Sequence, residues 1–187
     1  MLTAFLIALA FVFAAEMGDK TQLVALAFAT RFKTSIVLTG VFGATILVHL
    51  FSVFIGEAAS FVIPTFWIKI IAGIAFILFG LWTLRGDKLE DEEKLTASRF
   101  GPLLTVAITF FIAELGDKTM LMTITIASEQ QQFVAVWLGS TVGMVIADGI
   151  AIGVGKLLGT SLPENLLKYG TATIFFLSGL YTIYEAF

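Results

Sequence analysis

The sequence predicts an all-α integral membrane protein, with six transmembrane helices arranged as two inverted three-helix repeats. Three observations support this prediction: the chain is unusually apolar, its apolar residues fall into six long runs, and its second half repeats the first. Of its 187 residues, 58% are hydrophobic and 13% are charged, and the mean hydropathy is +0.99. A soluble domain has about 45–50% apolar and about 25% charged residues. This composition therefore excludes a soluble enzyme and a disordered chain.

The charged and reactive residues narrow the kinds of site that the chain can hold. A net charge of −3 gives no basic surface for nucleic acid, so no nucleic-acid partner is expected. The absence of cysteine excludes disulfides and thiolate metal sites, and a single histidine, His49, excludes a site of several imidazoles. A metal would depend mainly on oxygen ligands, which favour hard cations such as Ca²⁺, Mg²⁺ or Mn²⁺.

Six apolar runs are long enough to cross a bilayer as helices, which requires about 20 residues each. They cover residues 3–29, 35–56, 66–85, 101–127, 133–155 and 164–185. Because the runs are continuous rather than alternating, helices are favoured over a β-barrel. The first run resembles the apolar part of a signal peptide, but no Lys or Arg precedes it and its last residues recur later in the chain. It is therefore expected to remain as a span.

The positions of Lys and Arg predict how the spans are oriented. One side of the membrane would hold eight of these residues, and the other side would hold Lys69 alone. The eight are Arg31, Lys33, Arg85, Lys88, Lys94, Arg99, Lys156 and Lys168. The side with eight is expected to be cytoplasmic, with both termini on the opposite side. The absence of a transit sequence favours a bacterial inner membrane.

The chain is expected to have three parts. The first three-helix repeat covers residues 1–86, an acidic cytoplasmic linker covers 87–99, and the second, inverted repeat covers 100–187. The linker is interpreted as a solvated connector, in which Glu90 and Lys94 have the spacing of a helical ion pair. A regulatory cation sensor is the alternative interpretation of its acidic residues.

The second half of the chain repeats the first. The segment Ala-Glu-Met-Gly-Asp-Lys-Thr at 15–21 returns as Ala-Glu-Leu-Gly-Asp-Lys-Thr at 113–119, an offset of 98 residues. After one inserted residue the offset becomes 99, and the glycines, a proline and the third spans match in register. Each half holds three predicted spans, so the second half would enter the membrane from the opposite side. Inverted repeats are typical of secondary transporters, which bind their substrate at the repeat interface.

Charged residues lie near the middle of the first predicted span of each half. They are Glu16, Asp19, Lys20, Glu114, Asp117 and Lys118. One charge at the centre of a span costs ~2.5–3.5 kcal/mol, so these side chains must face the protein interior. Four acids against two lysines leave a surplus of two negative charges, which a divalent cation or two protons would neutralise. The alternative interpretation is a structural network of ion pairs that holds the helices together.

The glycine in each motif permits a helix break or a close helix contact. If Gly18 and Gly116 break their helices, carbonyl groups become available to a cation. The aspartate that follows each glycine could then cap the next half-helix, and Thr21 and Thr119 could add hydroxyl oxygens. Close helix approach is also expected at one of two glycine pairs in the fifth span, at residues 139 and 143 or at 149 and 153.

The doubled Glu-x-Gly-Asp-Lys-Thr pattern resembles the Gdt-type family of cation/proton antiporters, and the resemblance covers essentially the whole chain. The family signature is Glu-x-Gly-Asp-(Lys or Arg)-(Ser or Thr), once in each half, and both copies here fit it. The resemblance implies transport of Mn²⁺, Ca²⁺ or both in exchange for protons, and in a bacterium manganese export. These ions would be transported substrates, and no prosthetic group is expected.

The resemblance also implies roles for individual residues. The cation-binding acids would be Glu16, Asp19, Glu114 and Asp117, and the remaining motif positions are Gly18, Lys20, Thr21, Gly116, Lys118 and Thr119. Gln22 follows the first motif, whereas Met120 stands at the equivalent place, so the two half-sites need not be equivalent. The hypothesis is that the two first spans meet near the midplane and pool four carboxylates, for which protons and a divalent cation compete.

Two further polar residues lie in the second predicted span of each half. His49 and Asp148 occupy equivalent positions and are candidates for a proton relay or for lining the pathway. The plainer interpretation of His49 is an interior histidine with its hydrogen bonds satisfied.

Three alternative functions remain: an intramembrane aspartyl protease, a passive divalent-cation channel and a structural membrane scaffold. Beyond the bilayer, the expected partners are the cation and protons. The sequence leaves the ion preference, transport direction, proton stoichiometry and oligomeric state open, a homo-oligomer included.

Overall fold

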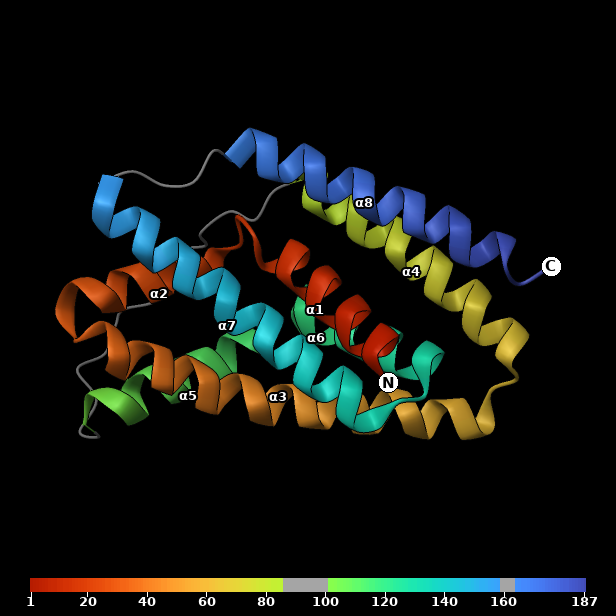
Figure 1. The fold of residues 1–187 in the computed structure, drawn as a ribbon, viewed down its shortest axis with the longest axis horizontal. Helices are drawn as coiled ribbons and strands as arrows, with labels where there is room; N and C mark the ends of the chain where they lie inside the picture. The colour runs from red at the N-terminus through yellow and green to blue at the C-terminus, as the bar shows by residue number, and fades with distance from the viewer. Residues whose placement is uncertain (86–100, 159–163) are drawn as a thin grey trace.

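The computed structural model describes residues 1–85, 101–158 and 164–187. The described residues form eight α-helices (Figure 1). They are α1 (Leu2–Glu16), α2 (Lys20–Arg31), α3 (Thr34–Val62), α4 (Thr65–Arg85), α5 (Pro102–Glu114), α6 (Lys118–Gln130), α7 (Phe133–Leu158) and α8 (Glu164–Tyr184). The linker predicted at 87–99 lies outside the described residues.

The first and fourth predicted runs are not single helices. Each is divided at its Gly-Asp pair, into α1 and α2 in the first half and into α5 and α6 in the second. The axes of α1 and α2 differ by 76° across the break. A glycine with a left-handed backbone interrupts each run, so each run contains the helix break that its glycine is expected to permit.

The described helices are those of a membrane protein. Within this part of the chain, α3, α4 and α7 are each long and apolar enough to cross a bilayer, and the bent pair α1–α2 adds a fourth candidate. Apolar side chains are widely exposed on these helices, including Phe51, Phe54 and Leu78. Exposure of so large an apolar surface is unfavourable in water but favourable in the hydrocarbon core of a bilayer.

The helices of the two halves pack against one another rather than separately. Helix α1 lies along α7, α5 lies along α3, and α4 lies beside α8 (Figure 1). Equivalent helices run in opposite directions in this view, α3 against α7 and α4 against α8. The first helix of each half therefore packs on the long helix of the other half.

The contacts between the halves are reciprocal. A Cβ atom placed on Gly40 of α3 would lie 2.8 Å from the side chain of Val106 in α5. At the equivalent position in α7, a Cβ atom on Gly139 would lie 3.1 Å from the Cβ of Ala8 in α1, and Ala8 is the residue equivalent to Val106. Only glycine permits these helix approaches.

One contact joins a residue to its own equivalent. The hydroxyl group of Thr45 in α3 lies 3.3 Å from the sulfur of Met144 in α7, and the two residues are 99 positions apart. Both side chains are buried. This contact therefore joins equivalent positions of the two halves in the interior.

Only one of the two glycine pairs considered in α7 makes a close helix contact. A Cβ atom on Gly143 would lie 2.5 Å from the carbonyl oxygen of Leu9 in α1. By contrast, a Cβ atom on Gly149 would only reach Leu38 at 4.0 Å, and one on Gly153 would meet nothing within 4 Å. The pair Gly139 and Gly143 therefore allows α1 to pack closely against α7.

A polar cluster closes the end of the α4–α8 pair that is expected to face away from the cytoplasm. The ammonium group of Lys69 lies 3.3 Å from Oε2 of Glu185, and the hydroxyl of Tyr181 donates a hydrogen bond of 2.8 Å to Oε1. These two hydrogen bonds lower the pKa of Glu185. Glu129 follows the predicted fourth span, and its partial burial together with the nearby charge of Glu185 raises its pKa.

Candidate functional site

The two motifs form the same backbone break. Gly18 has a φ of +81° and Gly116 a φ of +79°. Residues with a side chain rarely adopt this left-handed conformation, which costs roughly 1–2 kcal/mol. After each glycine, the aspartate N–H donates back to the glutamate carbonyl, at 3.0 Å in the first half and 3.3 Å in the second. The prediction that these glycines break their helices is confirmed.

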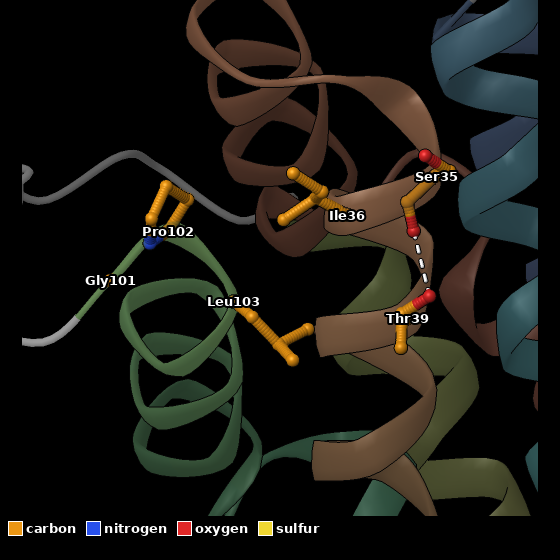
Figure 2. A pocket seen from close by; sticks show the side chains of 6 residues that line it. All are labelled: Ser35, Ile36, Thr39, Gly101, Pro102 and Leu103. Carbon is orange, nitrogen blue, oxygen red and sulfur yellow. Dashed lines mark hydrogen bonds between the residues drawn. The ribbon is translucent and has the colours of Figure 1, made fainter.

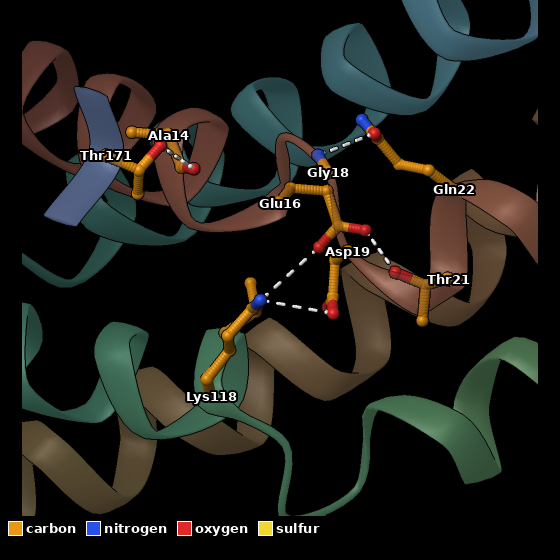
Figure 3. Close-up of polar contacts among 9 residues, drawn as sticks. Ala14, Glu16, Gly18, Asp19, Thr21, Gln22, Lys118 and Thr171 are labelled. Atoms are coloured by element: carbon orange, nitrogen blue, oxygen red, sulfur yellow. Dashed lines mark hydrogen bonds and ion pairs between the residues drawn. The ribbon is translucent and has the colours of Figure 1, made fainter. Parts of the chain in front are cut away.

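The first break redirects backbone hydrogen bonds to side chains. In an unbroken helix, the N–H of Gly18 would bond the carbonyl of Ala14. Here the Gly18 N–H donates instead to Oε1 of Gln22 at 2.9 Å, and the hydroxyl of Thr171 in α8 donates to the Ala14 carbonyl at 3.1 Å (Figure 3). Both groups that the break leaves without a helical partner are therefore satisfied, as buried backbone groups require.

The acids of the two motifs are buried inside the protein. Glu16 and Glu114 have no solvent exposure, Asp19 is 1% exposed and Asp117 is 7% exposed. These acids also interact electrostatically across the halves, since Glu114 experiences the charges of Glu16, Asp19 and Asp117. The structure therefore places all four predicted acids in the interior and close enough for their charges to interact.

The first-half acids have partners from both halves. Thr21 donates a hydrogen bond to Oε1 of Glu16, and Thr119 from the other half donates to Oε2 of Glu16 at 3.3 Å. Lys118 from the second half forms an ion pair with Asp19, with Nζ 3.1 Å from Oδ1, and Figure 3 shows Lys118 pointing toward the first break. The first-half acids are thus held by residues of the second motif.

Glu114 does not reproduce the hydrogen bonding of Glu16. Neither carboxylate oxygen of Glu114 has a hydrogen-bond partner within the described part of the chain, and the same holds for both oxygens of Asp148 and both ring nitrogens of His49. All three side chains are completely buried. Asp148 interacts electrostatically with Glu16, so it lies near the acidic centre. A buried polar group without a partner is costly, which makes these three the chemically unusual residues of the interior.

The capping predicted for the aspartates is not seen in the second half. Asp117 occupies the N-cap position of α6, but its side chain makes no capping hydrogen bond. The hydroxyl groups of Thr21 and Thr119 both donate hydrogen bonds to Glu16. In this arrangement the hydroxyl groups stabilise one carboxylate.

The acids are not assembled as a ready metal site. Across residues 1–85, 101–158 and 164–187, no group of three His, Asp or Glu side chains is arranged to hold a metal ion. A pocket of about 400 Å³ opens elsewhere, between the N-terminal ends of α3 and α5 (Figure 2). It is lined by Ser35, Ile36, Thr39, Gly101, Pro102 and Leu103. This pocket lies about 17 Å along α5 from the acidic motif.

Comparison with known proteins identifies the family. The family model described as "Divalent cation/proton antiporter GDT1" matches residues 4–91 and 102–187, so each half is matched with its own break and acids. The chain belongs to the GDT1 family. Members of this family are transporters, so the chain is a transporter and not an enzyme, and the intramembrane protease alternative is excluded.

Several relatives of this GDT1 protein match over almost its whole length. A Vibrio cholerae protein named "Putative manganese exporter" is 32% identical over 172 residues, which cover 91% of this chain and 85% of the relative. A GDT1-like protein of Synechocystis is 31% identical and covers 95% of both chains. The Saccharomyces cerevisiae protein named "Divalent cation/proton antiporter GDT1" is 23% identical, over 100% of this chain and 85% of its own length. No solved structure matches the chain.

Proposed function

We propose that this protein exchanges a divalent cation, Mn²⁺ or also Ca²⁺, for protons, and that it exports manganese from a bacterial cell. The carrying observation is the burial of four acids from two equivalent helix breaks, where they interact across the halves. A pure ion-pair network would balance its charges, but the two motifs contain four acids and two lysines. The surplus of two negative charges would be neutralised by a bound cation or by protons.

We propose further that the chain crosses the membrane six times, as two inverted three-helix repeats. In this arrangement α1–α2 and α5–α6 are each one broken span. The reciprocal contacts of Gly40 and Gly139, and the opposite directions of equivalent helices, support the twofold relation. A broken first span in each half is the feature by which inverted-repeat transporters bring backbone and acidic groups to the midplane.

The transport site would be formed by Glu16, Asp19, Glu114 and Asp117. Carboxylate oxygens are ligands of both Mn²⁺ and Ca²⁺. Since no three of these groups are assembled here, cation binding would draw the second-half acids toward Glu16 and exchange the threonine hydrogen bonds of Glu16 for contacts with the ion. Lys118 would balance the charge of Asp19 through their ion pair.

Proton coupling would arise from competition for the same oxygens. A carboxylate that binds a proton cannot serve as an anionic ligand, so loading the site with a cation requires the release of protons. Rocking of one repeat against the other would then expose the site to alternate sides. His49 and Asp148, buried without partners at equivalent positions of α3 and α7, are proposed as the proton relay beside this site.

The proposed placement in the membrane follows from the charge distribution. The linker at 87–99 would lie in the cytoplasm and both termini on the opposite side, in a bacterial inner membrane. Figure 1 shows both termini toward the right of the view, where α3 leads into α4, and this arrangement supports a common side for them.

The decisive experiment measures Mn²⁺ or Ca²⁺ uptake and lumenal pH together in liposomes containing the purified protein. Cation flux should depend on the pH gradient and should move protons in the opposite direction. Glu16→Gln and Glu114→Gln should abolish the flux while the protein stays folded. Glu185→Gln is the matched control, because this exposed glutamate lies outside the motifs.

Three results would contradict the proposal. Full exchange by the double variant of Glu16 and Glu114 would remove the acids from the mechanism. Cation flux that is independent of the pH gradient would favour the passive channel, and the absence of any flux would favour the structural scaffold.

A further inference from the structure

Gln22 connects the break in the first half to the long helix of the second half. Its Oε1 accepts the Gly18 N–H at 2.9 Å (Figure 3), and its Nε2 donates to the carbonyl oxygen of Ala147 in α7 at 3.1 Å. The Gln22 amide also lies 3.7 Å from the sulfur of Met17. The side chain is buried, and its partner in α7 is 125 residues away in the sequence. One amide thus fixes the break against the residue that precedes Asp148.

The second break has no such connection through the equivalent side chain. Met120 stands 98 residues after Gln22, and the N–H of Gly116 lies 3.2 Å from its sulfur. A thioether can accept a weak hydrogen bond but cannot donate one. Met120 therefore replaces the acceptor function of Gln22 without its donor function.

The carbonyl group that would receive the missing bond is already occupied. The residue equivalent to Ala147 is Val48 in α3, and its carbonyl accepts a hydrogen bond of 2.7 Å from the hydroxyl of Ser52. In α7 the residue equivalent to Ser52 is Ala151, which has no hydroxyl group. The two halves therefore differ at both ends of this contact. In one, the amide of Gln22 donates to the Ala147 carbonyl, which has no competing hydroxyl group. In the other, Met120 has no donor, and the Val48 carbonyl already accepts the hydroxyl of Ser52.

We propose that Gln22 is a positioning residue that anchors the first break to α7, so that the second break, at Gly116, is the one that rearranges during transport. This inference rests on the proposed antiport function for the meaning of the movement, but the anchoring itself is a property of the folded chain. The hydrogen bonding of the acids agrees with it. Glu16 on the anchored break accepts two threonine hydroxyl groups, and Glu114 on the other break accepts none within the described residues.

Hydrogen–deuterium exchange of the full-length protein in lipid nanodiscs tests the anchor without transport. Amides around Gly18 should exchange more slowly than those around Gly116, on the order of tenfold for one additional buried hydrogen bond. Gln22→Met should remove the difference, and Ala151→Ser should reduce it, because a hydroxyl at 151 would compete for the Ala147 carbonyl. Met120→Leu is the matched control and should leave exchange at Gly18 unchanged. Equal exchange at the two breaks of the unmodified protein would overturn the anchor.

Transport tests whether the second break moves. Met120→Gln combined with Ser52→Ala supplies a donor and frees the Val48 carbonyl, so it should anchor the second break and slow exchange at Gly116. The maximal rate of Mn²⁺/proton exchange should then fall on the order of tenfold with an unchanged KM for Mn²⁺, whereas Ser52→Ala alone should transport normally. Because a loss of folded protein would also lower the maximal rate without changing KM, the rate is divided by the amount of folded protein recovered in the liposomes.

The outcomes distinguish this inference from the proposed function. A doubly substituted protein that shows slowed exchange at Gly116 but transports Mn²⁺ at the unmodified rate would refute movement of the second break. If the unmodified protein transports no cation, the proposed function fails, while the difference in amide exchange between the breaks still decides whether Gln22 anchors the first one.

Discussion

Replacement of Gly116 by alanine should destabilise the protein through the backbone alone. Gly116 has a φ of +79°, and a Cβ atom placed on it would meet nothing within 4 Å. The substitution therefore introduces no collision, only a left-handed conformation that costs an L-amino acid roughly 1–2 kcal/mol. For a chain of this length, each kcal/mol shifts Tm by roughly 2–4 °C, so Tm should fall by about 2–8 °C.

Two companion variants separate this cause from a general effect of the substitution. Gly153 in α7 also has no atom within 4 Å of an added Cβ, but it lies in a regular helix. Gly153→Ala should therefore raise the stability by about 0.5–1 kcal/mol, since alanine restricts the unfolded chain and favours the helix. Gly116→Asn should lose less stability than Gly116→Ala, because asparagine adopts the left-handed conformation more readily.

Thermal unfolding of the three purified variants in one detergent, followed by intrinsic fluorescence, provides the assay. The reasoning fails if Gly116→Ala raises Tm as Gly153→Ala does. In that case the left-handed break would not be the stable conformation of the second motif.

Other substitutions test the packing and the charges away from the motifs. Gly143→Ala should lower Tm, because its Cβ would lie 2.5 Å from the carbonyl oxygen of Leu9 in α1. Gly149→Ala should leave Tm unchanged, because its Cβ would lie 4.0 Å from the nearest atom. Equal Tm values for the two variants would contradict the close α1–α7 contact. Glu129→Gln should raise Tm at pH 7, because the raised pKa of Glu129 means that its ionised form destabilises the fold, and the gain should vanish as the pH falls below about 4.5. Glu185→Gln should lower Tm slightly at pH 7, because its lowered pKa means that its ionised form stabilises the fold, and this loss should also vanish below about pH 4.5. For either glutamate, a Tm difference of the opposite sign would refute its assignment.

Local features of the sequence were sufficient to predict the class of protein and to place four acids in its interior. Apolar runs report membrane helices because lipid selects residue by residue, and a charge within such a run is costly wherever the chain folds. The same local reasoning identified Gly18 and Gly116 as candidates for helix breaks, which the structure confirms. The doubled motif pointed to the transporter family that the comparisons identify.

Contacts between distant residues could not be predicted in this way. Nothing near Gln22 in the sequence indicates that its amide reaches Ala147, and the relevant difference between Ser52 and Ala151 becomes visible only once the helices are paired. The choice between the two glycine pairs of α7 likewise depended on where α1 lies.

The sequence by itself determined that this chain lies in a membrane and that four acids lie beside two glycines that permit a helix break. These properties follow from the solvent preference and backbone freedom of individual residues. Only the tertiary structure decided that Glu16 receives both threonine hydroxyl groups, that Glu114 receives none in the described chain, and that one break is tied to the opposite half. Two nearly identical motifs acquire different partners because the helices packed around them carry different side chains.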